Sequence, residues 1–315
     1  MEAEAIGIDV GGTKITALRV AGRGRILARA EAPTPADDPE ACIAVMTQIA
    51  DRLCTAAVRA VGVGAAGMVE AATGTLRYAP NLAWRELPIA ARMTQALGLP
   101  CRVENDANAA AWGEFRFGAA RGHPDLLLVT VGTGIGGGIV SGGKLLRGAH
   151  GFAAEIGHII VEPGGPVCGC GNRGCWEQVA AGRAIDRLGR DAARENPNSL
   201  LARLAGGDPE RADGRLVTDA AMQGDDIAAR ILAMVGRRLG EGMAGLANIL
   251  DPEMVVVGGG AMAAGDLLLV PAREAFADSV EAPEHRPAVP IVAAALGNDA
   301  GGVGAAALAL EELGS

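Results

Sequence analysis

Aromatic side chains are scarce in this sequence of 315 residues, where tryptophan, tyrosine and phenylalanine together make up 3%. Since 50% of the residues are nevertheless apolar, alanine, valine and leucine must fill a core of considerable size. The length corresponds to one large domain or two ordinary ones.

Long apolar runs and a basic leader are also missing. No apolar stretch reaches the roughly 18–20 residues that span a bilayer. The opening residues, MEAEAIGIDV, carry two acids where a secretory signal has lysine or arginine. We therefore expect a cytoplasmic protein that does not enter a membrane.

Positive charge is in deficit, because 28 lysines and arginines face 37 aspartates and glutamates, for a formal net charge of −9. Nucleic acids and anionic membranes bind basic surfaces, so neither is expected as a partner. A small phosphorylated ligand is not excluded, since a few convergent backbone N–H groups bind phosphate even on an acidic protein.

The six cysteines are unevenly placed, and three of them fall within eight residues: Cys168, Cys170 and Cys175. Disulfides are not expected in a cytosolic chain of this size. With His158 ten residues upstream, the three thiols form the Cys₃His set of a closed structural zinc site. The alternative is a group of three reduced, buried cysteines.

The order of apolar runs and glycine turns indicates an α/β architecture. A strand–glycine turn–strand unit at residues 5–20 recurs about 120 residues later, at 126–141. This duplication predicts two similar lobes, each built on a sheet, with a cleft between them. Further strands are expected at 61–65, 101–103 and 254–257, and helices at 39–59, 90–97, 107–115, 182–205, 219–250 and 301–313, with a loop at 80–88.

The first glycine turn, Gly11-Gly12-Thr13-Lys14, lies between two predicted strands and follows Asp9. Glycines allow positive φ and close approach of the backbone to a phosphate, and successive N–H groups form an anion-binding nest. The hydroxyl of Thr13 and the charge of Lys14 could add to it, and Asp9 is placed to hold Mg²⁺. The alternative is a plain hairpin turn.

The second glycine turn covers residues 132–137 and includes Thr133 and Gly134. It matches G-x-G-x-x-G, but no helix opens after it, which disfavours a dinucleotide site and an NAD-dependent dehydrogenase. No Walker A motif is present, because Lys144 is followed by Leu145. A hairpin whose turn binds a phosphate fits this segment better than a dinucleotide site does. A third site, Gly258-Gly259, could let a flat nucleobase approach the backbone, or simply end a strand.

Seven stretches together resemble the ROK family of sugar kinases and repressors, within the actin-like ATPase superfamily. They are IGIDVGGTK, YAPNLAW, VENDANAAAWGE, TVGTGIGGGIV, GFAAEIGHIIV, CGCGNRGCWE and VVVGGG, in the expected order over most of the chain. The resemblance implies a two-lobed actin-like ATPase (ribonuclease H-like) fold, with ATP on the glycine turns and sugar at the base of the cleft. We expect a smaller lobe of residues 1–117 with the helix at about 299–315, and a larger lobe of 118–298 that carries the zinc loop. Because the phosphate motif starts at Ile6, we expect the chain to lack the DNA-binding domain that precedes this motif in the repressors, which favours a kinase.

Asp106 is the expected catalytic base. A carboxylate within hydrogen-bond reach of a sugar hydroxyl can accept its proton as the bond to phosphorus forms, and the resemblance assigns this role to the aspartate of the Glu-Asn-Asp motif. The alternative is an N-cap for the helix at 107–115.

The resemblance also names the sugar ligands. A carboxylate can accept hydrogen bonds from two adjacent hydroxyls, which suits a diol. Glu155 and His158 are three residues apart and would share a face of a helical turn. If one nitrogen of His158 binds zinc, the other can donate to the sugar. Surface acids and turn residues are the plain alternatives. The full expected set is Gly67, Asn81, Asn105, Asp106, Glu155, His158 and Glu177.

The expected activity is transfer of phosphate from ATP to a hexose hydroxyl, with glucose converted to glucose 6-phosphate. Kinases for fructose, N-acetylglucosamine or N-acetylmannosamine share the same motifs, and a non-catalytic sugar sensor is the alternative from another class. The expected cofactors are ATP, Mg²⁺ and structural Zn²⁺. By resemblance, the partner beyond the small molecules is a second copy of the chain, in a homodimer or higher homo-oligomer.

Overall fold

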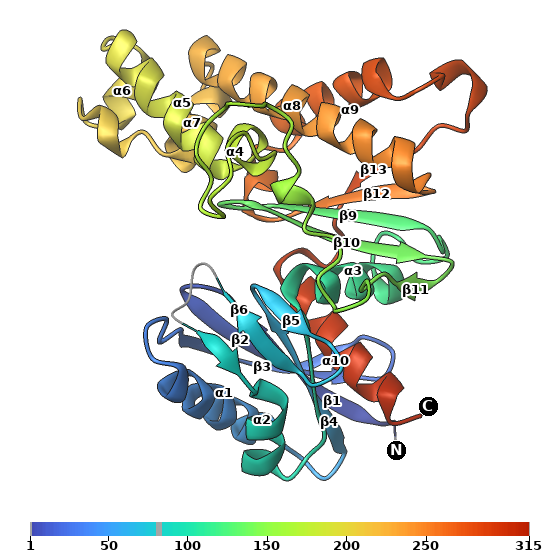
Figure 1. The fold of residues 1–315 in the computed structure, drawn as a ribbon. Coiled ribbons are helices and arrows are strands. Elements are labelled where there is room, and N and C mark those ends of the chain that lie inside the picture. Colours follow the sequence, from blue (N-terminus) through green and yellow to red (C-terminus); the bar gives the residue numbers. More distant parts are fainter. Residues whose placement is uncertain (1, 80–83, 315) are drawn as a thin grey trace. The chain divides into compact units, whose positions relative to one another are not determined.

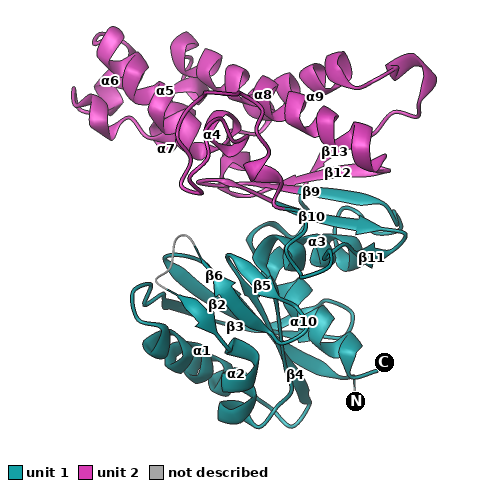
Figure 2. Cartoon of the chain, viewed as in Figure 1, with its two compact units in different colours: residues 1–128, 137–154, 294–315 teal, residues 129–136, 155–293 magenta. Residues whose placement is uncertain are grey.

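The computed structural model describes residues 2–79 and 84–314 (Figure 1). The predicted ligand Asn81 lies outside these residues. The chain divides into two compact units (Figure 2). Unit 1 comprises Met1–Leu128, Gly137–Ala154 and Ala294–Ser315, and unit 2 comprises Val129–Gly136 and Glu155–Ala293. The two lobes expected from the sequence, residues 1–117 with about 299–315 and residues 118–298, stay a prediction.

Unit 1 is built on a five-stranded sheet of order β3-β2-β1-β4-β8. Three strands, β1 (Glu4–Val10), β2 (Lys14–Ala21) and β3 (Ile26–Pro33), are joined as an antiparallel meander. The other two, β4 (Val58–Ala65) and β8 (Cys101–Asn105), continue the sheet from β1 in parallel. The predicted first hairpin is confirmed.

Helices cover both faces of this sheet. On one face, α1 (Pro39–Leu53) and α2 (Ile89–Leu97) enclose the main apolar core with alternate residues of β1. On the other face, α10 (Ala300–Glu312) packs on β1 and β4 beside α3 (Asp106–Phe117). This approach needs glycine, because a Cβ on Gly7 would overlap the carbonyl of Gly302.

A small antiparallel sheet of three strands also belongs to unit 1: β5 (Met68–Glu70), β6 (Thr75–Tyr78) and β7 (Arg85–Leu87). The loop predicted over 80–88 is therefore wrong for Arg85–Leu87, which pairs with β6. A strand of three residues is too short to show alternation in sequence.

The second five-stranded sheet has the order β11-β10-β9-β12-β13, which repeats the order of the first. Its strands are β9 (Leu126–Val131), β10 (Ile135–Ser141), β11 (Lys144–Leu145), β12 (Met254–Gly258) and β13 (Ile291–Ala293). The expectation of a duplicated strand–turn–strand unit is thus confirmed at the level of topology.

The helices of unit 2 gather around the long helix α8 (Asp226–Leu250), which packs against α5 (Gly182–Glu195), α7 (Gly214–Met222) and α9 (Asp266–Ser279) (Figure 1). Two short helices, α4 (Glu177–Ala180) and α6 (Leu200–Leu204), complete the set. The helices predicted over 182–205 and 219–250 are each divided, because Ser199 and Asp225 act as N-caps for new helices. Within the described residues, every helix is too short or too polar to cross a bilayer.

Candidate active site

The carboxyl ends of three parallel strands bring predicted site residues of unit 1 to one sheet edge. In the register of β1, β4 and β8, Asp9 lies level with Gly64, and Gly64 lies level with Glu104. Asn105 ends β8 and Asp106 begins α3. In open α/β sheets this edge is where ligands bind, so the fold places Asp9 and Asp106 where a reacting group can meet both.

The first turn of α3 separates two readings of Asp106. The N-cap is Asn105, whose Oδ1 accepts hydrogen bonds from the N–H groups of Ala107 at 2.9 Å and Asn108 at 3.0 Å. Asp106 is the first helical residue, and its Oδ1 also accepts from Ala107 at 2.9 Å. The capping role proposed as an alternative for Asp106 therefore belongs to its neighbour.

The side chain of Asn105 also ties the motif to Gly67. Its Nδ2 donates to the carbonyl of Gly67 at 3.1 Å. Gly67 has φ +125, and a Cβ there would overlap the carbonyl of Tyr78, so only glycine fits. Two predicted sugar ligands, Gly67 and Asn105, are thereby in direct contact.

The two carboxylates at the sheet edge are held out of their usual ionisation range. Burial, followed by the nearby Asp106 carboxylate, raises the pKa of Asp9 to about 7, against the opposing charge of Lys14. Burial also raises the pKa of Asp106, while N–H groups of the α3 start and Asn105 lower it. A raised pKa suits a general base that works near neutral pH, and a cation between the two carboxylates would relieve their repulsion.

The first glycine turn differs from expectation in its backbone. Neither Gly11 nor Gly12 has a positive φ, so the turn does not depend on left-handed geometry. A Cβ on Gly12 would meet no atom within 4 Å. The carbonyl of Gly11 accepts from Oγ1 of Thr34 at 2.7 Å. Because C=O and N–H point in opposite directions across a trans peptide, the N–H of Gly12 points away from Thr34.

Lys14 is engaged by a carboxylate in this structure. Its Nζ donates to Oε1 of Glu31 at 3.0 Å, and both side chains are exposed. An exposed pair of this kind contributes little to stability, because water and salt screen it. Lys14 can therefore exchange Glu31 for a phosphate at little cost.

The second glycine turn is oriented by the start of α5. The N–H groups of Gly182 and Arg183 donate to the carbonyls of Gly132 at 2.8 Å and Thr133 at 3.2 Å. The N–H groups on the other side of these two peptides, those of Thr133 and Gly134, therefore point away from α5. Two adjacent N–H groups that point the same way are the elements of an anion nest.

The third glycine site closes on the same turn. Gly259 has φ +92, and a Cβ there would lie 2.5 Å from the carbonyl oxygen of Val131. Gly258 is the buried last residue of β12. The structure thus brings Gly259 against the strand end that leads into Gly132, which places two of the three predicted nucleotide segments side by side.

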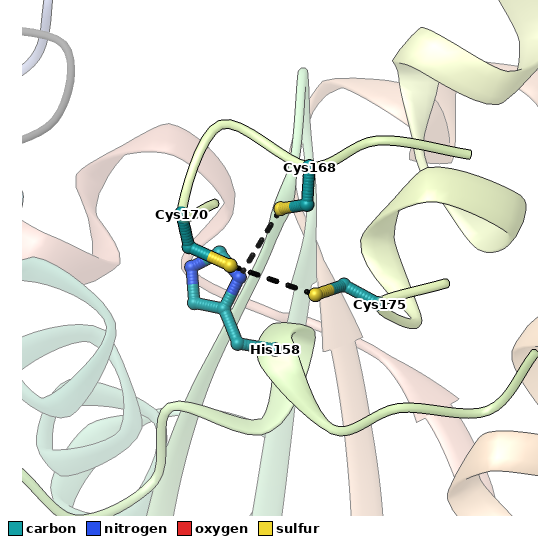
Figure 3. Close-up of side chains that lie close together, drawn as sticks. All are labelled: His158, Cys168, Cys170 and Cys175. Atoms are coloured by element: carbon teal, nitrogen blue, oxygen red, sulfur yellow. Dashed lines mark hydrogen bonds between the residues drawn. The ribbon is translucent and has the colours of Figure 1, made fainter. Parts of the chain in front are cut away.

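The predicted metal ligands converge in unit 2 (Figure 3). The ligand atoms of His158, Cys168, Cys170 and Cys175 all lie within 4.8 Å of one another. Sγ of Cys168 is 3.6 Å from Nδ1 of His158, and the Sγ atoms of Cys170 and Cys175 are 3.6 Å apart. Tetrahedral zinc with Zn–S of about 2.3 Å sets sulfur atoms about 3.8 Å apart, so this donor set fits Zn²⁺.

Burial raises the pKa of two thiols of this cluster. It raises the pKa of Cys175 to about 12, together with the neighbouring thiols, and it raises that of Cys168. Cys170 is exposed. Cys168 and Cys175 therefore stay protonated at neutral pH unless a cation replaces their protons, so metal binding must release them.

The loop that carries the cluster is fixed to α8. The buried Trp176 donates from Nε1 to the carbonyl of Arg238 at 2.9 Å, and its indole ring fills the space where a Cβ on Gly242 would lie. The next residue, Glu177, is 9% exposed, and its Oε1 accepts from Sγ of Cys168 at 3.1 Å. Zinc would replace the proton that Cys168 donates, so the chain connection through Trp176, and not this hydrogen bond, links the Glu177 carboxylate to the metal loop.

The remaining predicted sugar ligands lie on a short helical turn. The 3₁₀ helix Ile156–His158 follows Glu155, whose carbonyl accepts from the N–H of His158 at 3.1 Å. The expected helical turn is confirmed. Since Nδ1 of His158 faces Cys168, Nε2 is the ring nitrogen left for a second partner.

One neighbour of the site escaped the sequence reasoning. A Cβ on Gly301, in the first turn of α10, would lie 3.1 Å from Cγ of Asp9. Consecutive glycines at the start of an alanine-rich helix are unfavourable in isolation. This was the available signal that something packs closely there.

The chain is similar to known proteins over almost its whole length. The sequence profile of the ROK family matches residues 5–312. A glucokinase from Streptomyces coelicolor is 44% identical over 309 residues, which cover 97% of each chain. An N-acetylmannosamine kinase from Escherichia coli is 37% identical over 311 residues, 98% of each chain. Among solved structures, a ROK family glucokinase from Streptomyces griseus in complex with glucose and AMPPNP has a TM-score of 0.90 and 44% identity, and it covers 98% of this chain and 100% of that one. The expected fold class is confirmed.

Proposed function

Since the chain belongs to the ROK family, we propose that it is a hexokinase-type phosphotransferase that transfers phosphate from ATP to glucose, giving glucose 6-phosphate. The observation that carries this proposal is the pair Asp9 and Asp106 at one sheet edge, with the helix cap supplied by Asn105. The glucokinases at 44% identity support the reaction, and the glucose and AMPPNP bound by one of them support both substrates.

Asp106 is proposed as the general base. Its carboxylate accepts the proton of the sugar hydroxyl as the hydroxyl oxygen forms a bond to the γ-phosphorus of ATP. The bond between that phosphorus and the β,γ-bridging oxygen breaks, and ADP leaves with the electron pair. Catalysis of phosphoryl transfer rests mainly on positioning and charge neutralisation. The raised pKa of Asp106 supports its role as proton acceptor.

Nucleotide phosphates are assigned to two sets of N–H groups. The turn of Gly11, Gly12, Thr13 and Lys14 is proposed for one, and Thr133 with Gly134 for the other, because their N–H groups point away from α5. Gly258 and Gly259 are proposed to leave room for the base. Mg²⁺ neutralises charge on the terminal phosphates when bound, and Asp9 is the residue proposed to hold it.

The polar groups proposed to bind the sugar hydroxyls rest on the family's motifs, and each is described within its own unit. Asn105, Asp106 and Gly67 belong to unit 1, and Asn81 is proposed from sequence alone. Glu155, Nε2 of His158 and Glu177 belong to unit 2. Zinc held by His158, Cys168, Cys170 and Cys175 is proposed to be structural: it fixes His158 and Glu177 and takes no part in phosphate transfer. A homodimer or higher homo-oligomer and a cytoplasmic location stay predictions.

A coupled ADP-release assay with Mg-ATP tests the function. Glucose, fructose, mannose, N-acetylglucosamine and N-acetylmannosamine should be compared on the wild type and on Asp106→Ala. We expect turnover on glucose that the variant loses. Preferred turnover of N-acetylmannosamine would move the assignment towards the relative that is 37% identical. Binding of sugar by calorimetry without turnover on any of them would support the sensor.

A further inference from the structure

An ion pair between the buried Glu104 and the partly exposed Arg147 lies directly beside the proposed catalytic base and has no part in the mechanism above. Glu104 precedes Asn105 in β8 and is 1% exposed. Its Oε2 accepts a hydrogen bond from Nε of Arg147 at 2.6 Å. Arg147 follows β11, 43 residues further along the chain, and both residues belong to unit 1.

The other oxygen of Glu104 binds the start of α3. Oε1 accepts from the backbone N–H of Asn105 and from Nδ2 of Asn108, each at 3.2 Å. These two residues stand on either side of Asp106 in the first turn. Oδ1 of Asn108 is buried without a hydrogen-bond partner among the described atoms, so Glu104 is the group that orients the Asn108 side chain.

Arg147 reaches Glu104 from a closed loop. Its carbonyl accepts from the N–H of Ala153 at 3.1 Å. Within this loop Gly148 and Gly151 have φ of +71 and +91, and a Cβ on Gly151 would lie 2.6 Å from the carbonyl oxygen of Val69. The backbone of the loop therefore has little room to shift at Gly151. The Arg147 guanidinium, which binds the Glu104 carboxylate, is carried by this confined loop.

Stability alone does not account for such a pair. Desolvation of the buried Glu104 carboxylate offsets much of its attraction to Arg147, whose side chain is 29% exposed. An apolar pair could not replace the contacts of Glu104. One oxygen of its carboxylate accepts hydrogen bonds from Asn105 and Asn108, beside Asp106, and the other accepts from Arg147.

We propose that Glu104 and Arg147 are positioning residues, which fix the first turn of α3 and thereby aim the Asp106 carboxylate at the sugar hydroxyl. This inference rests on the proposed function. A displacement of about 1 Å in a reacting group can lower a rate on the order of 100-fold, so the pair should act on kcat more than on substrate affinity.

Arg147→Met and Arg147→Lys test the proposal in the ADP-release assay with glucose. We expect Arg147→Met to lower kcat about 10- to 100-fold while KM for glucose and for ATP changes less than about 3-fold. Arg147→Lys should recover at least part of the lost kcat, because lysine still supplies a cation. Arg92→Met is the matched control, since Arg92 pairs with the exposed Glu40, and it should keep kcat within about 2-fold.

The double variant Glu104→Gln/Arg147→Met separates positioning from the cost of an unpaired charge. It leaves no buried carboxylate unpaired, so it should fold even where Arg147→Met does not. Positioning predicts that its kcat stays as low as that of Arg147→Met. Recovery of wild-type kcat in the double variant, or unchanged kcat in Arg147→Met, would overturn the proposal. Absence of turnover in the wild type run alongside would instead count against the proposed function.

Discussion

Gly134 lies so close to Glu177 that a Cβ on the glycine would overlap Oε2 of the carboxylate. The phosphate turn and a proposed sugar ligand are thus packed against each other within unit 2, and the absence of a side chain at residue 134 is what makes room for Glu177. A substitution at Gly134 or at Glu177 should therefore change the affinity for both substrates, glucose and ATP.

Gly134→Ala should therefore raise KM for glucose and for ATP together, each by about 10-fold, the effect of roughly 1.4 kcal/mol. The reason is displacement of Glu177, not backbone strain, because φ at residue 134 is not in the left-handed region. Steady-state kinetics measure it. Gly132→Ala is the control in the same turn, since a Cβ there would meet no atom within 4 Å. A normal KM for glucose in Gly134→Ala would contradict the assignment of Glu177.

The zinc loop and sugar binding should fail together. In Cys170→Ala one thiolate is lost from the set, and without the metal the loop no longer fixes Glu177, which follows Cys175 by two residues. We expect loss of bound zinc by atomic absorption and at least a 10-fold weaker glucose affinity by calorimetry, by analogy with the effect of other residues that support metal ligands. Cys54→Ala, outside the cluster, should change neither. Wild-type glucose affinity in metal-free Cys170→Ala would rule out the link.

Much of the fold was predictable because its signals are local. The hairpin at residues 5–20 and the strand at 126–131 combine apolar runs with glycine turns, and both are present. The strand Ile26–Pro33 was missed, since its outward residues include charges and it forms a sheet edge. Helix α9 was also missed, because Pro271 lies inside it and packing outweighs the loss of one hydrogen bond.

The candidate site was predictable where its residues lie in one motif. The spacing of three cysteines within eight residues predicts a metal-binding loop: Cys168, Cys170 and Cys175. The contact of Glu104 with Arg147 is different, because nothing in sequence relates an acid in a strand to an arginine 43 residues away. Gly301 near Asp9 likewise depends on how α10 packs on the sheet. Only tertiary structure brings such pairs together.

The ionisation of Asp9 predicts how stability depends on pH. Its pKa is raised to about 7, whereas an unfolded aspartate has a pKa of about 3.9. Between these values the native state binds more protons than the unfolded state, so this group makes stability fall as pH rises from about 4 to about 7. Asp9→Asn removes the cost and should be more stable than the wild type at pH 8, by on the order of 1–3 kcal/mol, but not at pH 4.

Thermal unfolding of Asp9→Asn at both pH values measures this difference. Asp37→Asn, at an exposed aspartate, serves as the control and should unfold like the wild type at either pH. Asp9→Asn should also lose activity with Mg-ATP, because the substitution removes the carboxylate proposed to hold the cation. Equal stability of Asp9→Asn and wild type at pH 8 would show that Asp9 ionises normally.

Gly301 gives a test that separates helix propensity from the site. Alanine is favoured over glycine within a helix by about 1 kcal/mol, so Gly301→Ala would stabilise α10 if nothing opposed it. A Cβ there, however, would lie 3.1 Å from Cγ and 3.2 Å from Oδ2 of Asp9. We expect Gly301→Ala to push the carboxylate aside and raise KM for Mg-ATP about 10-fold, an effect of roughly 1.4 kcal/mol, with little change for glucose.

The matched variant is Gly245→Ala, at an exposed position of α8 where a Cβ would meet no atom within 4 Å. It should raise the free energy of unfolding by about 0.5–1 kcal/mol and leave both KM values unchanged. If Gly301→Ala behaved in the same way, the helix start would tolerate a methyl group beside Asp9. The geometry of that carboxylate would then not limit binding of the nucleotide, and another group would have to hold the cation.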